Sequence, residues 1–163
     1  MDADVVPAYR FRDYTNDFRF DANNYVAGIE IRPDSGGRII NYPEQHIKNG
    51  IEKNLKTNYQ FKRCVRVMKN IREDMNDNGF RISNQISSFG LESLLWNIPD
   101  GIFTKYSSMK YIFEELVDYL YKNMGNFSMY YEANGIKKLF SKSEIQIAYT
   151  NFVKDLKAFY AYE

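Results

Sequence analysis

Residues 59–75 read YQFKRCVRVMKNIREDM, and the apolar members of this run recur at helical spacing. Six of them share one face of a helix: Phe61, Cys64, Val65, Met68, Ile71 and Met75. The run stops at 76–79, where Asn-Asp-Asn-Gly is typical of a helix end. This pattern predicts a helix over 59–75 that buries one side in a helical bundle.

The residues on both sides of this run predict further helices. Pro43 followed by Glu44 is a typical helix start, and that helix is expected to run to about Lys56. Apolar periodicity predicts three more helices, over 88–97, 107–122 and 143–162. The turn-forming run 99–101 is expected to close the first of these.

The first 42 residues have the pattern of strands instead. Strands are predicted over 4–11, 25–32 and 38–40, with a loop over 13–24 and a turn at 33–37. Strands followed by a run of helices predict an α+β fold, mostly α, with a strand segment over 1–42 and a helical domain over 43–163. Because two or three strands rarely form a stable sheet alone, either the helices cover them or further strands lie elsewhere.

Composition excludes several classes of protein. With 44% hydrophobic and 26% charged residues among 163, the chain is an ordinary globular protein, and its net charge of +1 argues against strong binding to duplex nucleic acid. The single cysteine, Cys64, cannot form an internal disulfide, and no apolar run approaches the ~18 residues of a membrane span. The single histidine, His46, is a poor zinc-site candidate. We therefore expect a cytoplasmic protein with no membrane segment.

Two charged features could carry chemistry. Asp4 lies at the start of an apolar strand, where it is either a metal ligand or a solvated acid at a frayed terminus. Lys62, Arg66 and Lys69 are spaced i, i+4 and i+7 on the predicted helix, opposite its apolar face. This stripe is either a clamp for a triphosphate or an ordinary solvated face.

Two hydroxyls precede an aromatic residue at the start of the helix predicted over 88–97. Ser87 and Ser88 form an N-cap signal, with Glu92 placed for a capping box. Phe89 is either an exposed ring on which a base could stack or an aromatic residue of the core.

The order of Asp4-Val5-Val6-Pro7-Ala8, Cys64-Val65-Arg66-Val67-Met68-Lys69 and Ser87-Ser88-Phe89 resembles the C-terminal half of a DNA polymerase β-type nucleotidyltransferase of the cGAS/DncV-like group (the CD-NTases). The resemblance implies that Asp4 is the third catalytic carboxylate and a metal ligand. It also implies that Lys69 contacts the phosphates of the donor nucleotide, and the spacing of the stripe adds Lys62 and Arg66 to the same predicted nucleotide site. In the same way, Ser87 and Ser88 would contact phosphate while Phe89 stacks on the base. The helices would form a lobe like the substrate-binding domain of poly(A) polymerases and oligoadenylate synthetases.

The family takes nucleoside triphosphates with Mg²⁺ and joins nucleotides with loss of pyrophosphate, and its bacterial members make cyclic oligonucleotide signals for antiphage defence. The Gly-Ser motif and first acid pair of the family are not in these 163 residues. Taken alone, the chain is therefore not expected to catalyse, and Mg²⁺ is expected only with the missing half. The chain could be a piece of a longer protein, a C-terminal subunit that pairs with a separate N-terminal nucleotidyltransferase half, or a truncated reading frame.

A different class of protein is also compatible with the sequence. A non-catalytic helical module could bind a partner protein, or sense a nucleotide, through its aromatic surface. The two hypotheses differ over Lys69 and Phe89, which should meet in a cleft in a nucleotide-binding protein. A fully buried Phe89 would favour the interaction module.

Overall fold

The computed structural model describes residues 7–14, 22–81 and 85–160. Its sheet has three antiparallel strands, β1 (Tyr9–Asp13), β2 (Val26–Ile31) and β3 (Ile39–Asn41), with β2 in the middle. Gly36 and Gly37, in the turn between β2 and β3, have φ angles of +87° and +84°, which glycine adopts at little cost. The three predicted strands and the turn are confirmed, although β1 begins at Tyr9 and extends to Asp13, which was predicted to lie in a loop; residues 4–6 of the first predicted strand lie outside the described residues.

The helices follow the strands, as the sequence predicts. They are α1 (Pro43–Lys56), α2 (Gln60–Asp77), α3 (Ser88–Trp96), α4 (Asp100–Thr104), α5 (Met109–Lys122), the 3₁₀ helix η2 (Met124–Met129) and α6 (Ser143–Tyr160). The α+β arrangement is confirmed, and α1 has the predicted limits. Neither α4 nor η2 is predicted by the sequence pattern. Pro99, expected only to close α3, also caps α4, because a proline followed by an acid suits a first helical turn.

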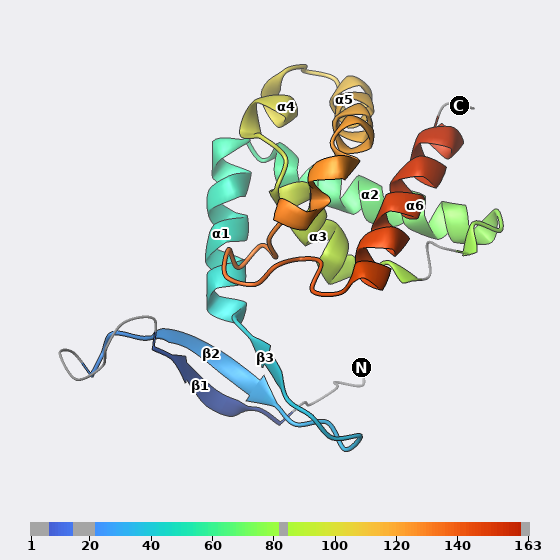
Figure 1. The fold of residues 1–163 in the computed structure, drawn as a ribbon. Helices are drawn as coiled ribbons and strands as arrows, with labels where there is room; N and C mark the ends of the chain where they lie inside the picture. Colours follow the sequence, from blue (N-terminus) through green and yellow to red (C-terminus); the bar gives the residue numbers. More distant parts are fainter. Residues whose placement is uncertain (1–6, 15–21, 82–84, 161–163) are drawn as a thin grey trace, which may run out of the picture.

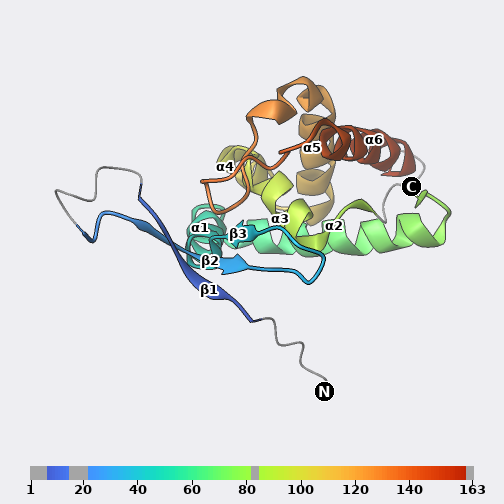
Figure 2. The same ribbon diagram turned by 60° about the horizontal axis from the view of Figure 1, so that its bottom comes forward.

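The sheet lies to one side of the helical bundle, and α1 joins the two parts (Figure 1). In the view from the sheet side, α1 lies next to and behind β2 and β3, and α2 extends from there along the bundle (Figure 2). Two side-chain hydrogen bonds link the start of α1 to the sheet. Tyr42 Oη donates a 2.6 Å hydrogen bond to Asp13, and Gln45 Nε2 donates to the carbonyl of Ala27 at 3.0 Å. The described helices cover only part of the sheet, since its outer residues Tyr9 and Ile39 are exposed.

The core lies inside the bundle, where α2 packs on α3, α4 and α6. Of the six predicted inward residues of α2, five are buried and Ile71 is half-buried. Cys64 is fully buried and unpaired, and this burial raises the pKa of its thiol to about 12. No helix within the described ranges is long and apolar enough to cross a membrane.

Candidate functional site

The start of α3 is anchored by a helix cap and by a tyrosine from α6. The Ser87 hydroxyl accepts a 3.0 Å hydrogen bond from the Gly90 amide, which confirms the predicted N-cap. The Tyr149 hydroxyl lies over Gly90, so close that an added Cβ would be 1.6 Å from it. Ser87 therefore has a structural role, and the next two residues, Ser88 and Phe89, are left exposed.

Phe89 lies on the surface and not in the core, with 46% of the residue exposed. Its ring stacks on the imidazole of His46 from α1, with centroids 4.8 Å apart and planes 21° from parallel. This stack holds the ring in one orientation and leaves part of it open to a ligand. The nitrogen Nδ1 of His46 is buried and has no hydrogen-bond partner within the described residues.

Glu92, one turn beyond Phe89, faces the same histidine. Its Oε1 lies 3.8 Å from Nε2 of His46. The imidazole holds the pKa of the Glu92 carboxyl below its ordinary value, although burial opposes this shift; Lys69 and Lys62 of α2 act in the same direction as the imidazole. The charges of both lysines therefore reach the Glu92 carboxylate on α3.

The expected capping box is wrong. Since Ser87 is the cap, the third helical position is Gly90, and Glu92 lies too far along α3 to bond back to the cap. Its carboxylate is instead a counter-charge for the histidine and the two lysines.

An apolar pocket of about 230 Å³ opens beside the Phe89 ring. It lies where β2, the β3–α1 junction, α3 and a loop after η2 meet. Its lining is Ile29, Asn41, Tyr42, Pro43, His46, Ile47, Phe89 and Asn134. Mainly apolar walls with an aromatic face and a few amide groups suit a flat heteroaromatic ring. The lysines nearby supply positive charge for an anionic group on the same ligand.

The structure separates Arg66 from the two lysines with which its spacing grouped it. Arg66 lines a different hollow, with Arg63 and Ser107 among its neighbours. Lys62 and Lys69 act on Glu92. Arg66 thus lines a hollow that neither lysine lines, because a long side chain at the edge of a helical stripe can turn to either side.

Asp4, the predicted catalytic and metal-binding carboxylate, lies outside the described residues. Within the described ranges, no group of three or more His, Cys, Asp or Glu side chains could hold a metal ion. The described residues by themselves therefore do not provide the oxygen ligands of a magnesium site.

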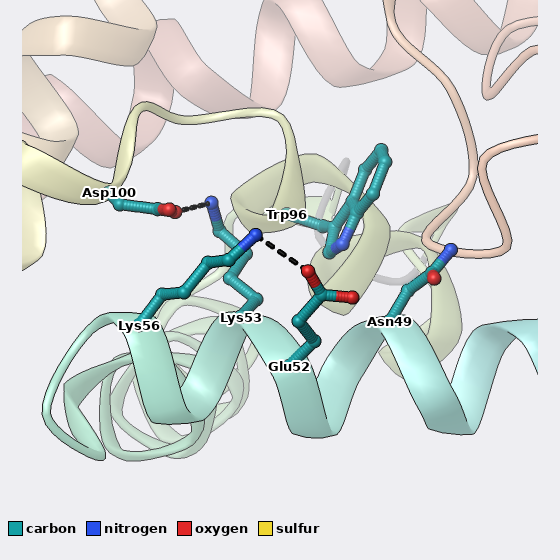
Figure 3. A pocket seen from close by; sticks show the side chains of 6 residues that line it. All are labelled: Asn49, Glu52, Lys53, Lys56, Trp96 and Asp100. Carbon is teal, nitrogen blue, oxygen red and sulfur yellow. Dashed lines mark hydrogen bonds and ion pairs between the residues drawn. The ribbon is translucent and has the colours of Figure 1, made fainter.

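A second hollow, of about 170 Å³, lies where α1 meets α3 and α4 (Figure 3). Lys53 is buried there, and its ammonium donates 2.7 Å hydrogen bonds to the carbonyl of Ile98 and to Asp100. Lys56 pairs with Glu52 at 2.6 Å. Because these charged groups already have partners, we interpret this hollow as a polar contact between helices and not as a ligand site.

His46 and Glu92 are the site residues that sequence reasoning missed. For Glu92 a signal existed, because positions i and i+3 of a helix share a face, which places it beside Phe89. His46 comes from another helix, so its stacking on Phe89 could not be read from spacing.

Residues 48–162 match the family described as the cGAS/DncV-like nucleotidyltransferase C-terminal helical domain. This chain belongs to that family. The cyclic GMP-AMP synthase CdnE03 of Staphylococcus schleiferi is 42% identical over 161 residues, which cover 99% of this chain and 50% of the relative. The cyclic dipyrimidine nucleotide synthase CdnE of Legionella pneumophila is 38% identical over 145 residues, covering 89% of this chain and 48% of the relative.

Solved structures of the family share the fold. The CdnE cyclic dinucleotide synthase of Elizabethkingia meningoseptica, with GTP and Apcpp, superposes with a TM-score of 0.83 at 27% identity, covering 96% of this chain and 56% of that one. The CdnE c-UMP-AMP synthase of Rhodothermus marinus, with Apcpp and Upnpp, gives 0.78 at 26% identity, covering 93% and 52%. The chain thus spans about half the length of the relatives that it matches.

Proposed function

We propose that this chain is the nucleotide-binding C-terminal portion of a Mg²⁺-dependent nucleotidyltransferase that makes cyclic oligonucleotide signals. One observation supports this proposal above the others: Phe89 is exposed beside an apolar pocket, and the charges of Lys69 and Lys62 act on Glu92, one turn along α3. The relatives named above are cyclic nucleotide synthases, and two solved relatives were obtained with nucleotides. A role in antiphage defence follows from the resemblance and is part of the proposal.

In this proposal each side chain has a separate task. The base of the donor nucleotide stacks on the open part of the Phe89 ring, whose other contacts are already fixed by His46. Lys69 and Lys62 attract the phosphates, and the exposed Ser88 hydroxyl can donate to a phosphate oxygen.

Catalysis needs more than the described residues supply. Joining nucleotides with loss of pyrophosphate uses carboxylates that hold Mg²⁺, and the resemblance assigns one of them to Asp4. The resemblance assigns the other acids to the half of the family's proteins that this chain does not span. We therefore assign nucleotide binding to this chain and the reaction to the complete assembly.

Nucleotide binding can be tested by thermal unfolding with ATP or GTP, each with Mg²⁺. For a Kd of about 1 mM, 10 mM nucleotide adds about 1.4 kcal/mol of stability, which is roughly 3–6 °C in Tm. We expect the increase for wild-type and for the control Lys154→Ala, which changes an exposed lysine on α6. Lys69→Ala and Phe89→Ala should lose most of it. No increase for wild-type, or an equal increase for Lys69→Ala, would refute the site.

The competing hypothesis, a non-catalytic interaction module, expected a buried Phe89, whereas the ring is exposed. A module that only senses nucleotide would bind ATP or GTP through the same residues. It would release no pyrophosphate when combined with a nucleotidyltransferase domain, and an assay of pyrophosphate release separates the two functions.

A further inference from the structure

The loop between η2 and α6 contains a short hairpin, which we call the 131–138 hairpin. One antiparallel bridge pairs its two arms, and Gly135, with a φ angle of +72°, turns the chain between them. Asn134 is only 4% exposed, and its Oδ1 accepts hydrogen bonds of 2.8 Å and 3.0 Å from the amides of Ile136 and Lys137. These internal bonds give the hairpin a defined shape.

Two helices hold the 131–138 hairpin on the bundle. The amide of Ala133 donates a 3.1 Å hydrogen bond to Ser93 Oγ on α3, and its carbonyl accepts a 2.8 Å hydrogen bond from Asn49 Nδ2 on α1. Asn97, at the end of α3, donates to the carbonyl of Tyr131 at 2.7 Å and accepts from its amide at 3.0 Å. Since Ala133 and Ser93 are fully buried, breaking these bonds would leave buried polar groups without partners. The hairpin is therefore fixed to α1 and α3.

Lys137 extends from the 131–138 hairpin to the sheet. Its ammonium donates a 2.9 Å hydrogen bond to the carbonyl of Ile40 in β3, 97 positions earlier in the chain. Glu132 Oε1 lies 3.4 Å from the same ammonium, and Glu132 Oε2 accepts a 2.6 Å hydrogen bond from Asn134 Nδ2. In Figure 1 this loop runs along the edge of the bundle nearest the sheet. Lys137 thus connects the bundle to β3, and Glu132 orients its ammonium.

The hairpin and the sheet both line the candidate nucleotide pocket. Asn134 contributes from the hairpin, and Ile29 and Asn41 contribute from β2 and β3. The distance between hairpin and sheet therefore helps to set the width of the pocket, and the Lys137 hydrogen bond spans this distance. A pocket whose sides are already held in place loses less conformational freedom when a ligand binds.

We propose that Lys137 is a positioning residue for nucleotide binding. By holding β3 at a fixed distance from the 131–138 hairpin, it keeps the pocket at the width that a nucleotide base requires. Lys137 does not itself line the pocket, so it acts through the two segments that it connects. This inference rests on the proposed function.

The test compares Lys137→Met with Lys138→Met, a matched control from the next position. Methionine keeps an unbranched side chain and removes the ammonium. The Lys138 ammonium lies 4.0 Å from the centre of the Tyr131 ring and donates at 3.3 Å to the carbonyl of Met129, so its contacts are within the same loop and not with the sheet. Affinity for ATP or GTP, each with Mg²⁺, is measured by NMR titration. Circular dichroism checks that each variant is folded.

A second measurement reports the placement of the sheet directly. Nitroxide labels on Arg10→Cys in β1 and Lys154→Cys in α6, both at exposed positions, give the distance between sheet and bundle by double electron–electron resonance. The native Cys64 is fully buried and therefore protected from labelling. The labelled pair is prepared with Lys137, with Lys137→Met and with Lys138→Met.

We expect wild-type and Lys138→Met to bind nucleotide equally, and Lys137→Met to bind roughly 5–10-fold more weakly, which corresponds to the loss of about one hydrogen bond. Lys137→Arg keeps a cationic donor and should recover most of the affinity. The label distances should form one narrow distribution with Lys137 or Lys138→Met, and a broader or displaced distribution with Lys137→Met. Equal affinities or equal distance distributions for Lys137→Met and wild-type would overturn the proposal, even if Lys137→Met had a lower Tm.

Failure of this proposal can be distinguished from failure of the nucleotide site. If wild-type bound neither ATP nor GTP, the proposed function would fail and this inference with it. If wild-type bound nucleotide and Lys69→Ala lost that binding while Lys137→Met kept it, the site would stand and only the positioning role of Lys137 would be wrong.

Discussion

Replacing Gly90 with alanine should destabilise the protein, although helix propensity alone predicts the opposite. Within a helix, alanine is favoured over glycine by about 1 kcal/mol. Here the new Cβ would lie 1.6 Å from Oη and 2.8 Å from Cζ of Tyr149, and 3.1 Å from Oγ of Ser87. Tyr149 is only 4% exposed and its ring packs edge-on against Phe140, with centroids 5.1 Å apart. The tyrosine therefore cannot turn aside without disturbing the core.

The size of the effect follows from these contacts. Forcing an extra methyl group into a packed site costs about 3 kcal/mol. After the gain of about 1 kcal/mol in helix propensity, Gly90→Ala should lower the free energy of unfolding by about 2 kcal/mol, which corresponds to a fall in Tm of roughly 4–8 °C.

Urea unfolding followed by circular dichroism measures this effect, with Gly101→Ala as the matched control. Gly101 also lies in a helix, and an added Cβ there meets no heavy atom within 4 Å, so that variant should be as stable as wild-type or slightly more stable. Tyr149→Phe removes the clashing oxygen, so the double variant should be less destabilised than the sum of the two single variants by about 1 kcal/mol or more. A Gly90→Ala protein as stable as wild-type, or strictly additive effects, would refute this account of how α3 is anchored.

Three other predictions follow from the same contacts. Ser87→Ala should cost about 1 kcal/mol of unfolding free energy in urea titration, because it removes the helix cap, whereas Ser88→Ala should change stability by less than about 0.5 kcal/mol. The stability of wild-type relative to Glu92→Gln should be largest above pH 4.5 and should shrink as the pH falls through the lowered pKa of Glu92, as measured by urea titrations across that range. Lys53→Met should cost about 1–3 kcal/mol, because the carbonyl of Ile98 loses its buried donor, while Lys56→Met should leave the unfolding midpoint essentially unchanged.

Each of these predictions has a result that would contradict it. Equal effects of the two serine substitutions would mean that Ser87 is not the cap. If the difference in unfolding free energy between wild-type and Glu92→Gln stayed constant from pH 7 to pH 3, the charge of Glu92 would not contribute to stability. If Lys53→Met unfolded at the same urea concentration as Lys56→Met, the buried joint of Figure 3 would not contribute to stability.

The sequence alone determined the features that depend on residues within one or two helical turns. Pro43 and Glu44 set the start of α1, the apolar spacing of 59–75 set the buried face of α2, and Ser87 set the cap of α3. Such signals act between neighbours in the chain, where steric limits and hydrogen bonds are the same in most contexts.

The tertiary structure decided which side chains from different helices meet. The stacking of His46 on Phe89 and the 3.8 Å approach of His46 Nε2 to Glu92 depend on how α1 and α3 are rotated about their axes when they pack, and spacing within either helix does not specify that rotation. The exposure of Phe89 has the same origin, since an aromatic residue at that position would suit a core equally well. Packing also placed Arg66 at a hollow that Lys69 does not line, and it brought Lys137 to the carbonyl of Ile40, 97 positions earlier in the chain.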